Sequence, residues 1–220
     1  MPLRAAEALR VIVTRPEGQG EELAARLREL GHEPVLCPLV RVELLGGEPI
    51  DIEPYDWLLV TSANAAAQLV RRMRGRPRRV AAIGSATAAA LEERGMRVDL
   101  VPAVSTQEGL LAELPRPAGR VLFAGAEDAR RLLVEELKAD FVPLYRTIEL
   151  EPERVPAGDL VVLASPSAAR AFARLGLELP AVSIGPQTTS AAASAGVVVA
   201  AEAETHDLDG LLDAVARLAP

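Results

Sequence analysis

The sequence contains very few aromatic residues, a single cysteine and a single lysine, and each scarcity excludes a class of protein. Aromatic residues make up only 3% of the 220 residues, so the stacking platforms that hold bases in nucleic-acid-binding proteins are nearly absent. Cys37 alone excludes an internal disulfide and a cysteine-cluster metal site, and we interpret it as a small buried side chain. No apolar run reaches the roughly 18 residues of a membrane span. Because Met1–Glu7 also lacks a signal-peptide core, we expect a cytoplasmic protein.

The charges agree with these exclusions. The formal net charge is -7, and Lys138 is the one lysine among 24 basic residues. Arginines are mixed with carboxylates at helical spacing, as in Arg26–Glu29 and Glu92–Arg94. Such mixing is typical of solvated helix faces. We therefore expect neither a nucleic acid nor a membrane as partner.

Familiar catalytic motifs are missing too. The chain has no phosphate loop ending in Gly-Lys-Ser/Thr, no Gly-x-Ser-x-Gly turn, and no Gly-x-Gly-x-x-Gly after a strand. His32 and His206 have no spaced partner that would indicate a metal site, so we interpret both as surface or capping residues. The acidic pair Glu127 and Asp128 is predicted to open a helix, where carboxylates favour the macrodipole.

Short apolar runs alternate with helical patterns along the whole chain. Helix signals are clear at Gln19–Leu30, at the capping box Ser105–Glu108, and at Ser165, where proline follows a capping serine. We expect ten strands, the first at Val11–Thr14 and the others near Val35, Leu59, Ala82, Val98, Leu122, Val142, Val162, Val182 and Val198. Apolar strands separated by helices predict parallel α/β sheets with helices on both faces.

The pattern is written twice. Asp56–Ser62 corresponds to Asp159–Ser165, and Ile83–Thr87 corresponds to Ile184–Thr188. A duplication of this kind predicts two similar lobes that face each other across a cleft.

The boundary between the lobes has two candidate positions. The repeat alone favours a cut at Pro115–Gly119, which divides the chain into equal halves. The similar extended segments Pro38–Val42 and Pro143–Thr147 have instead the character of crossings between lobes. Periodicity does not choose between these cuts.

Hydroxyl, amide and small residues gather at the carboxyl ends of the predicted strands, the edge at which parallel sheets bind ligands. Taken singly, each of these turns is an ordinary N-cap. Together they predict a large ligand with many acceptors, such as several carboxylates or phosphates, held by helix-start N–H groups. A non-catalytic two-lobed module that binds small anions is an alternative with the same support. The turns are Thr14–Pro16, Thr61–Asn64, Ser85–Thr87, Ser165–Ser167 and Pro186–Thr188.

In their order and spacing these motifs resemble the uroporphyrinogen-III synthase family, and the resemblance covers nearly the whole chain. No single motif is specific, but the combination is. The chain departs from the family at Ala124, where many members carry an arginine. The matching segments are Val13–Pro16, Thr61–Ala65, Ile83–Leu91, Leu144–Thr147, Ser165–Ala169, Ser183–Thr189 and Leu208–Leu211.

The resemblance implies an α/β fold of two flavodoxin-like three-layer lobes, each with a five-stranded parallel sheet, and a chain swapped between them. Lobe 1 would comprise residues 1–36 and 149–220, and lobe 2 residues 41–144. The linkers would lie at about 37–42 and 143–148. This choice places the boundary at the two Pro-Leu segments rather than at the middle of the repeat.

The resemblance also implies an activity. The family are hydro-lyases that close linear hydroxymethylbilane to uroporphyrinogen III, with loss of water and inversion of ring D, for haem, sirohaem and cobalamin biosynthesis. It implies no cofactor and no metal, a monomer, and a possible hand-over of substrate from hydroxymethylbilane synthase. A two-lobed protein of this kind would change its interlobe angle when ligand binds.

Site residues are carried over from the family onto matching positions. Tyr145 would assist departure of the hydroxyl, with a role as a packed hinge aromatic as the alternative. Carboxylate contacts are implied for Arg15, Ser62, Asn64, Ser85, Ala86, Thr87, Ser165, Ser167, Gln187 and Thr188.

Overall fold

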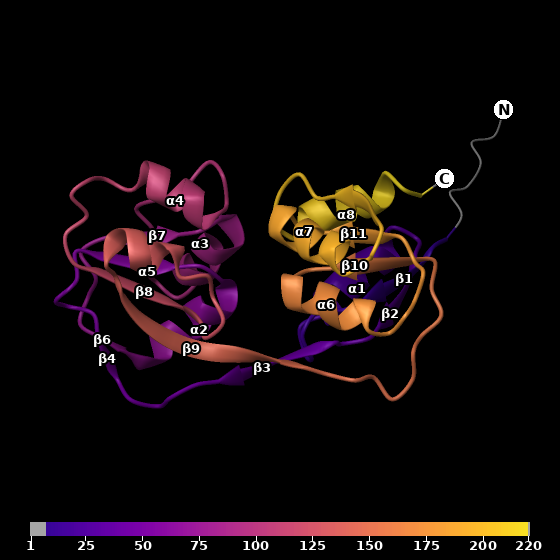
Figure 1. The fold of residues 1–220 in the computed structure, drawn as a ribbon, viewed down its shortest axis with the longest axis horizontal. Helices are drawn as coiled ribbons and strands as arrows, with labels where there is room; N and C mark the ends of the chain where they lie inside the picture. The colour runs from indigo at the N-terminus through magenta and orange to yellow at the C-terminus, as the bar shows by residue number, and fades with distance from the viewer. Residues whose placement is uncertain (1–7, 220) are drawn as a thin grey trace. The chain divides into compact units, whose positions relative to one another are not determined.

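The computed structural model describes residues 8–219, which form two compact α/β units (Figure 1). The discontinuous unit consists of the described residues up to Arg41 and those from Ile148 onward. The continuous unit is Val42–Thr147. Met1–Glu7, which belongs to the predicted first lobe and carries the expectation about export, lies outside the described residues.

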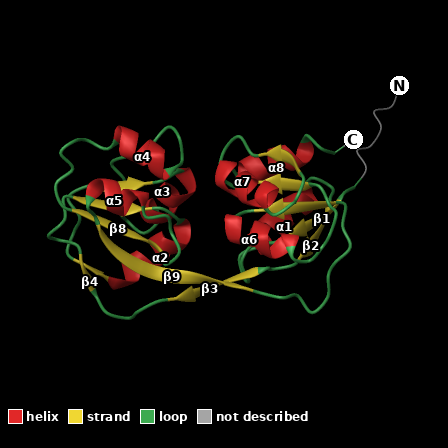
Figure 2. Ribbon diagram, in the orientation of Figure 1, coloured by secondary structure: helices red, strands yellow, loops and turns green. Residues whose placement is uncertain are grey.

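The discontinuous unit is built on one five-stranded sheet in the order β2-β1-β10-β11-β12, in which every neighbouring pair is parallel. Helices follow the strands as Figure 2 shows. The strands are β1 (Arg10–Val13), β2 (Glu33–Leu36), β10 (Leu160–Leu163), β11 (Ala181–Ser183) and β12 (Val199–Glu202), and the helices are α1 (Glu21–Glu29), α6 (Pro166–Ala173), α7 (Pro186–Ser194) and α8 (Leu208–Ala216).

Alternate residues of these strands pack on opposite faces of the sheet. Val11 and Val13 of β1 join a buried cluster with Leu27 of α1 and helix α8. Ile12 of the same strand joins a second cluster with Phe172 of α6 and helix α7. Because a strand presents successive side chains to opposite faces, both faces of the sheet are covered by helices.

The continuous unit contains a second sheet in the order β3-β9-β8-β5-β7, whose pairs β9-β8, β8-β5 and β5-β7 are parallel. β3 (Val40–Leu44) and β9 (Asp140–Glu149) each extend past the boundary between the units. The remaining elements are β4 (Ile50–Asp51), β5 (Trp57–Val60), α2 (Ala63–Arg72), β6 (Met73–Arg74), β7 (Val80–Ala82), α3 (Ser85–Glu92), α4 (Gln107–Glu113), β8 (Val121–Ala126) and α5 (Leu132–Leu137).

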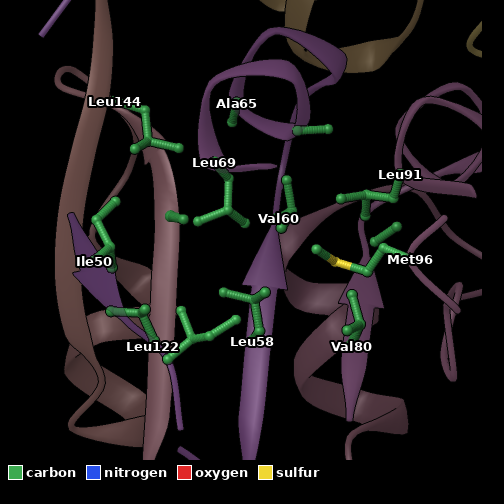
Figure 3. Packing of buried hydrophobic residues seen from close by; sticks show 14 of the residues in the cluster. Ile50, Leu58, Val60, Ala65, Leu69, Val80, Leu91, Met96, Leu122 and Leu144 are labelled. Atoms are coloured by element: carbon green, nitrogen blue, oxygen red, sulfur yellow. The ribbon is translucent and has the colours of Figure 1, made fainter. Parts of the chain in front are cut away.

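This second sheet is also covered on both faces. Leu58 and Val60 of β5 pack against Leu69 of α2 and helix α3 in the cluster shown in Figure 3. Trp57 and Leu59 pack on the other face, in a cluster that includes residues of α4 and α5. The predicted parallel α/β architecture is therefore confirmed for the first sheet and for β9, β8, β5 and β7 of the second. The edge strand β3 runs antiparallel to β9, since the Leu45 N–H donates to the Leu144 carbonyl and the Leu150 N–H to the Leu39 carbonyl.

One strand expectation needs correction, and three strands, β3, β4 and β6, were not among the ten expected. The strand expected near Val98 is reduced to an isolated bridge between Leu100 and Ala81. The fifth hydrogen-bonded strand of the second sheet is instead β3, at the edge beside β9. The short pair of β4 and β6 was not predicted, because two-residue strands carry no periodic signal.

The helix starts are partly as predicted. Ser165 caps α6 and Pro166 is its first residue, as expected. The cap of α4 is Thr106 rather than Ser105, and its hydroxyl accepts a hydrogen bond from the Gly109 N–H at 3.1 Å. Glu127 and Asp128 lie in a turn, and α5 begins only at Leu132, so the helix expected at this acidic pair is wrong.

Candidate functional site

The starts of α2 and α6 are built in the same way. Each helix follows a buried parallel strand, and each begins at a serine in extended conformation. Ser62 Oγ accepts a hydrogen bond from the Ala65 N–H at 3.1 Å, and Ser165 Oγ accepts one from the Ala168 N–H at 3.1 Å. The two repeats therefore place a capped helix start at the carboxyl edge of each sheet, where N–H groups are available to an anion.

A second polar residue stands two positions after each capping serine. Ser167 Oγ lies 3.0 Å from Ser165 Oγ, so the two hydroxyls form one pair. Asn64 takes the equivalent place in the other repeat, as the second residue of α2, and is half-buried. Both residues lie in the first turn of their helices.

The starts of α3 and α7 differ in how many N–H groups they offer. Gly84 and Gly185 are the caps, and their carbonyls accept the N–H groups of Thr87 and Thr188 at 3.1 and 3.0 Å. Both threonines are also buried. The exposed members of these turns are Ser85, Ala86 and Gln187.

Ser85, Ala86 and Gln187 are better placed to contact a carboxylate than the buried threonines, because they are exposed. Ser85 and Ala86 precede the first intrahelical bonds of α3, so both offer an N–H group at its start. Pro186 has no N–H, which leaves that of Gln187 at the start of α7. Thr87 and Thr188 keep their predicted positions at these edges but present neither an exposed side chain nor a free N–H.

Two further polar residues stand at these same helix starts, and sequence analysis missed both as site residues. A Cβ placed on Gly84 would lie 2.8 Å from Ser105 Oγ, and one placed on Gly185 would lie 2.8 Å from Cδ2 of His206. Only glycine leaves room for such close approach. Ser105 and His206 therefore cover equivalent glycines in the two units.

The repeat could have revealed this equivalence. Thr106–Leu111 and Asp207–Leu212 share an acidic residue, a glycine and two leucines in the same order, and each follows its glycine cap at the same spacing. Asp207 caps α8 by accepting a hydrogen bond from the Gly210 N–H at 2.9 Å. His206, interpreted from sequence as a surface or capping residue, lies directly before this cap. The interpretation of His32 as a surface or capping residue is wrong, because His32 is buried and its Nδ1 accepts a hydrogen bond from the Leu9 N–H at 3.3 Å.

Tyr145 lies on β9 and is buried within the cluster of the continuous unit. Its hydroxyl lies 2.9 Å from Ser62 Oγ. Burial raises the pKa of the Tyr145 phenol above its ordinary value, and the charge of Asp128 raises it further, whereas the hydrogen bond with Ser62 lowers it. The phenol therefore stays protonated at neutral pH. Only 7% of Tyr145 is exposed, so its side chain is packed, as the alternative of a hinge aromatic requires, and its part in the chemistry stays a prediction.

Arg15 follows β1 at the carboxyl edge of the discontinuous unit. The preceding residue, Thr14, is fully buried and donates its hydroxyl to the Val162 carbonyl at 2.7 Å, which fixes this corner of the chain. Nε of Arg15 is buried and has no hydrogen-bond partner among residues 8–219. Burial lowers the pKa of the guanidinium, and Glu22 acts in the opposite direction. A buried cationic donor without a partner is costly, and an anionic ligand would satisfy it.

The structure thus assembles two groups of predicted residues, each at the carboxyl edge of its own sheet. No three His, Cys, Asp or Glu side chains within the described chain are grouped so that they could hold a metal ion. Over the same residues, no helix is both long and apolar enough to cross a bilayer. The groups are Ser62, Asn64, Ser85, Ala86, Thr87 and Tyr145 in the continuous unit, and Arg15, Ser165, Ser167, Gln187 and Thr188 in the discontinuous unit.

Two compact α/β units, each with capped helix starts at the carboxyl edge of its sheet, define a two-domain α/β protein. Residues 21–213 match the family described as uroporphyrinogen-III synthase HemD. The chain therefore belongs to the uroporphyrinogen-III synthase family, whose members are cyclising lyases of tetrapyrrole biosynthesis.

Individual relatives agree. The chain is 27% identical to the uroporphyrinogen-III synthase of Synechococcus elongatus, over 95% of each chain. It is 32% identical to a putative uroporphyrinogen-III synthase of Archaeoglobus fulgidus, over 93% of this chain and 97% of the relative. A crystal structure of a mutant uroporphyrinogen III synthase from Thermus thermophilus superposes with a TM-score of 0.62 at 19% identity, covering 96% of this chain and 98% of that one. The last likeness shows the fold.

Proposed function

We propose that this chain performs the reaction of its family through the two groups of residues at its sheet edges. The reaction closes linear hydroxymethylbilane to uroporphyrinogen III, with loss of water and inversion of ring D. The observation that carries the proposal is the hydrogen bond between Tyr145 and Ser62 at the start of α2, because it joins a proton donor to a helix start that can bind a carboxylate.

In this proposal the protein binds hydroxymethylbilane through the carboxylates of the substrate. The substrate carries eight of them, and the helix starts of α2, α3, α6 and α7 offer N–H groups and hydroxyls to anions in a protein whose net charge is negative. We propose that Ser62, Ser85 and Ala86 contact some of these carboxylates, with Asn64 beside them. Arg15, Ser165, Ser167 and Gln187 contact others. Thr87 and Thr188 act by holding the turns, since both are buried.

Chemistry begins with the hydroxymethyl group. Protonation of its oxygen and cleavage of the carbon–oxygen bond release water and leave an azafulvene cation on ring A. In our proposal Tyr145 donates a hydrogen bond to Ser62 Oγ, which orients the Ser62 hydroxyl to donate a hydrogen bond to the departing oxygen. The proton that leaves with the water comes from solvent and is returned when the closed ring loses its proton. The raised pKa of Tyr145 suits a hydrogen-bond donor that remains protonated throughout.

Ring closure then depends on orientation. The substituted carbon of ring D attacks the cation to give a spiro intermediate, which opens and closes again with the ring inverted, and a proton is lost at the end. Closure without inversion competes in solution. Holding ring D in place is therefore the main contribution of the protein, an effect of positioning more than of acid strength.

We further propose that both units are flavodoxin-like lobes, with the chain swapped between them. The order β2-β1-β10-β11-β12 supports this, since it is the 2-1-3-4-5 order of that fold when strands are numbered along the chain. The order β9-β8-β5-β7, with the Leu100 bridge beside β7, gives the same pattern with a permuted start. The compact units support lobe boundaries near 36–41 and 144–149. A change of interlobe angle on binding stays a prediction.

The test is product analysis. The protein is incubated with freshly made hydroxymethylbilane, and the type I and type III isomers are separated. We expect predominantly type III, whereas type I alone, as in buffer, would leave only the alternative of a non-catalytic anion-binding module. Cytoplasmic location, a monomeric state and hand-over from hydroxymethylbilane synthase remain predictions, and a rate that rises when both enzymes are mixed would support the last.

A further inference from the structure

A strongly basic segment lies between α2 and β7, away from the residues discussed so far. Residues 71–79 contain six arginines and no acidic residue. Arginines elsewhere are mixed with carboxylates, as in Arg26–Glu29 and Glu92–Arg94, but those of this segment are not. Among the described residues only Arg78 of these six forms an ion pair, with Asp56 at 3.1 Å. The segment therefore concentrates positive charge on a protein that is acidic as a whole.

Local contacts hold the segment in place without neutralising it. Arg72 donates to the main-chain carbonyls of Leu45 and Glu48 at 2.8 and 3.0 Å. The guanidinium of Arg79 lies over the ring of Trp57, 4.5 Å from its centre. These contacts order the backbone, and the guanidinium charges remain available to a ligand.

A cavity of about 460 Å³ opens beside this segment, entirely within the continuous unit. Arg76, Arg78 and Arg97 line it together with one carboxylate, Asp99, which pairs with Arg97 at 3.3 Å. Its lining therefore carries an excess of positive charge. Apolar side chains complete the wall, namely Met73, Pro77, Val80 and Met96.

The cavity is separate from the candidate synthase site. It lies at the amino end of β7, which begins at Val80, whereas Ser85 follows the carboxyl end of the same strand. None of the residues assigned to carboxylate binding or to Tyr145 chemistry lines it. Its charge therefore needs an explanation of its own.

We propose that this cavity binds a small organic anion, one that carries a phosphate or paired carboxylates on an apolar body. Guanidinium groups bind both kinds of anion through paired hydrogen bonds. The methionines and valine suit the apolar part of the ligand, and methionine adapts well to flat or irregular partners. A volume near 460 Å³ lies within the range of small-molecule sites. The inference is independent of the proposed synthase activity.

Single-stranded nucleic acid fits the cavity less well than a small ligand. Such proteins stack bases on exposed aromatic rings, and the ring of Trp57 is buried beneath Arg79. A DNA duplex presents phosphates that could bind the same arginines, so the experiment includes one as a competitor.

The experiment is calorimetric titration of the full chain with three probes and a competitor. Adenosine triphosphate supplies phosphates on an organic body, coproporphyrin supplies carboxylates on one, and inorganic tripolyphosphate supplies charge alone. The test variant is Arg76→Gln/Arg97→Gln, whose side chains are exposed, Arg97 to 89%. The matched control is Arg28→Gln/Arg170→Gln, which removes two exposed arginines from the discontinuous unit. The competitor is a short DNA duplex.

We expect at least one organic probe to bind the wild type and the control alike, and to bind the test variant at least tenfold more weakly. Which probe binds decides between phosphate and carboxylate. Both variants should keep the type III product, because neither touches the synthase residues. Equal binding by the test and control variants, or no binding of any probe at millimolar concentration, would overturn the proposal. If tripolyphosphate bound as tightly as the organic probes, the proposed role of the apolar wall would be wrong. If the DNA duplex bound more tightly than every small probe, the choice of a small ligand would be wrong.

Discussion

The hydroxyl of Tyr145 lies 2.9 Å from Oγ of Ser62, which also accepts the Ala65 N–H at 3.1 Å. One serine oxygen thus caps α2 and holds the end of a buried phenol. Because the phenol is embedded in the core cluster of its unit, it positions this hydroxyl pair rigidly. The start of α2 is therefore the place where stability and the proposed chemistry are most closely linked.

Replacing Tyr145 by phenylalanine should separate these two roles. The ring keeps its packing, so we expect a loss of only about 1 kcal/mol in the free energy of unfolding, the usual net value of a hydrogen bond. The rate of type III formation should fall more, by roughly 10- to 100-fold, since the hydrogen bond that orients the Ser62 hydroxyl towards the departing oxygen is lost. Urea denaturation and isomer analysis measure the two effects.

Tyr55→Phe is the matched control for this change. Its hydroxyl also makes one hydrogen bond, to Asp140 at 2.8 Å, but the residue lies before β5, at the opposite end of the strand from Ser62. We expect a similar or smaller loss of stability and an unchanged rate. If both variants lowered the rate equally, the proposed role of Tyr145 would be wrong.

The link between Tyr145 and Ser62 can be measured directly by a double-mutant cycle. Ser62→Ala and Ser165→Ala should each cost about 1 kcal/mol through loss of a helix cap. Combined with Tyr145→Phe, Ser62→Ala should show a coupling energy of about 0.5 kcal/mol or more, because the residues are in contact. Ser165→Ala should show coupling near zero. Equal coupling for both serines would contradict a specific pair.

The helix starts were the most predictable part of the site. The pattern of an apolar strand followed by serine located α2 and α6 because capping is a local interaction. The cap of α4 was misplaced by one residue. Ser105 and Thr106 are equally good caps by sequence, and the close approach of Ser105 to Gly84 decides between them. That contact joins residues far apart in the chain, so no local pattern could reveal it.

Burial of the site side chains was not predictable for the same reason. Tyr145 was expected in a linker but lies within a ten-residue strand whose packing buries it. Arg15 was expected as a charged contact, and its unpartnered Nε is a property of the folded corner after β1. Charge clusters are different, since the arginines at 71–79 are visible in the sequence. The sequence does not reveal that two of them, Arg76 and Arg78, line a cavity.

Arg15→Gln should weaken binding without weakening the fold. The Michaelis constant for hydroxymethylbilane is expected to rise at least tenfold, since a charge-assisted contact is lost. The midpoint of thermal unfolding should stay the same or rise, because a buried cationic donor without a partner is removed. Arg10→Gln, which removes an exposed arginine paired with Glu33, is the control and should leave the Michaelis constant unchanged. Lower stability with unchanged binding would show that Arg15 is structural.

We expect His206, which lies over Gly185 at the start of α7, to contact the substrate as well. Gly185→Ala forces the imidazole aside, because the new methyl would lie 2.8 Å from Cδ2 and 2.9 Å from Nε2. We expect a loss of about 1–3 kcal/mol in stability from this overpacking, together with weaker substrate binding. His206→Ala should weaken binding alone. The double variant should regain most of the lost stability but not the binding, and recovery of both would argue against a contact between His206 and the substrate.

Acid should weaken the start of α4 through Glu108. Its carboxylate accepts two hydrogen bonds from Arg130, at 2.7 and 2.9 Å, and this partner is the main reason why its pKa is lowered from 4.5 to about 2. A lowered folded-state pKa means that stability is present above about pH 4.5 and lost as the pH falls towards 2.

The magnitude should be small, about 0.5 kcal/mol, because the pair is roughly half exposed and salt screens it. Glu108→Gln and Arg130→Gln should both flatten this part of the curve of unfolding free energy against pH, since either change removes the pair. The test is urea denaturation between pH 2 and 5 at low and high salt. If Glu108→Gln flattens the curve and Arg130→Gln does not, the low pKa comes from the helix start and not from the arginine.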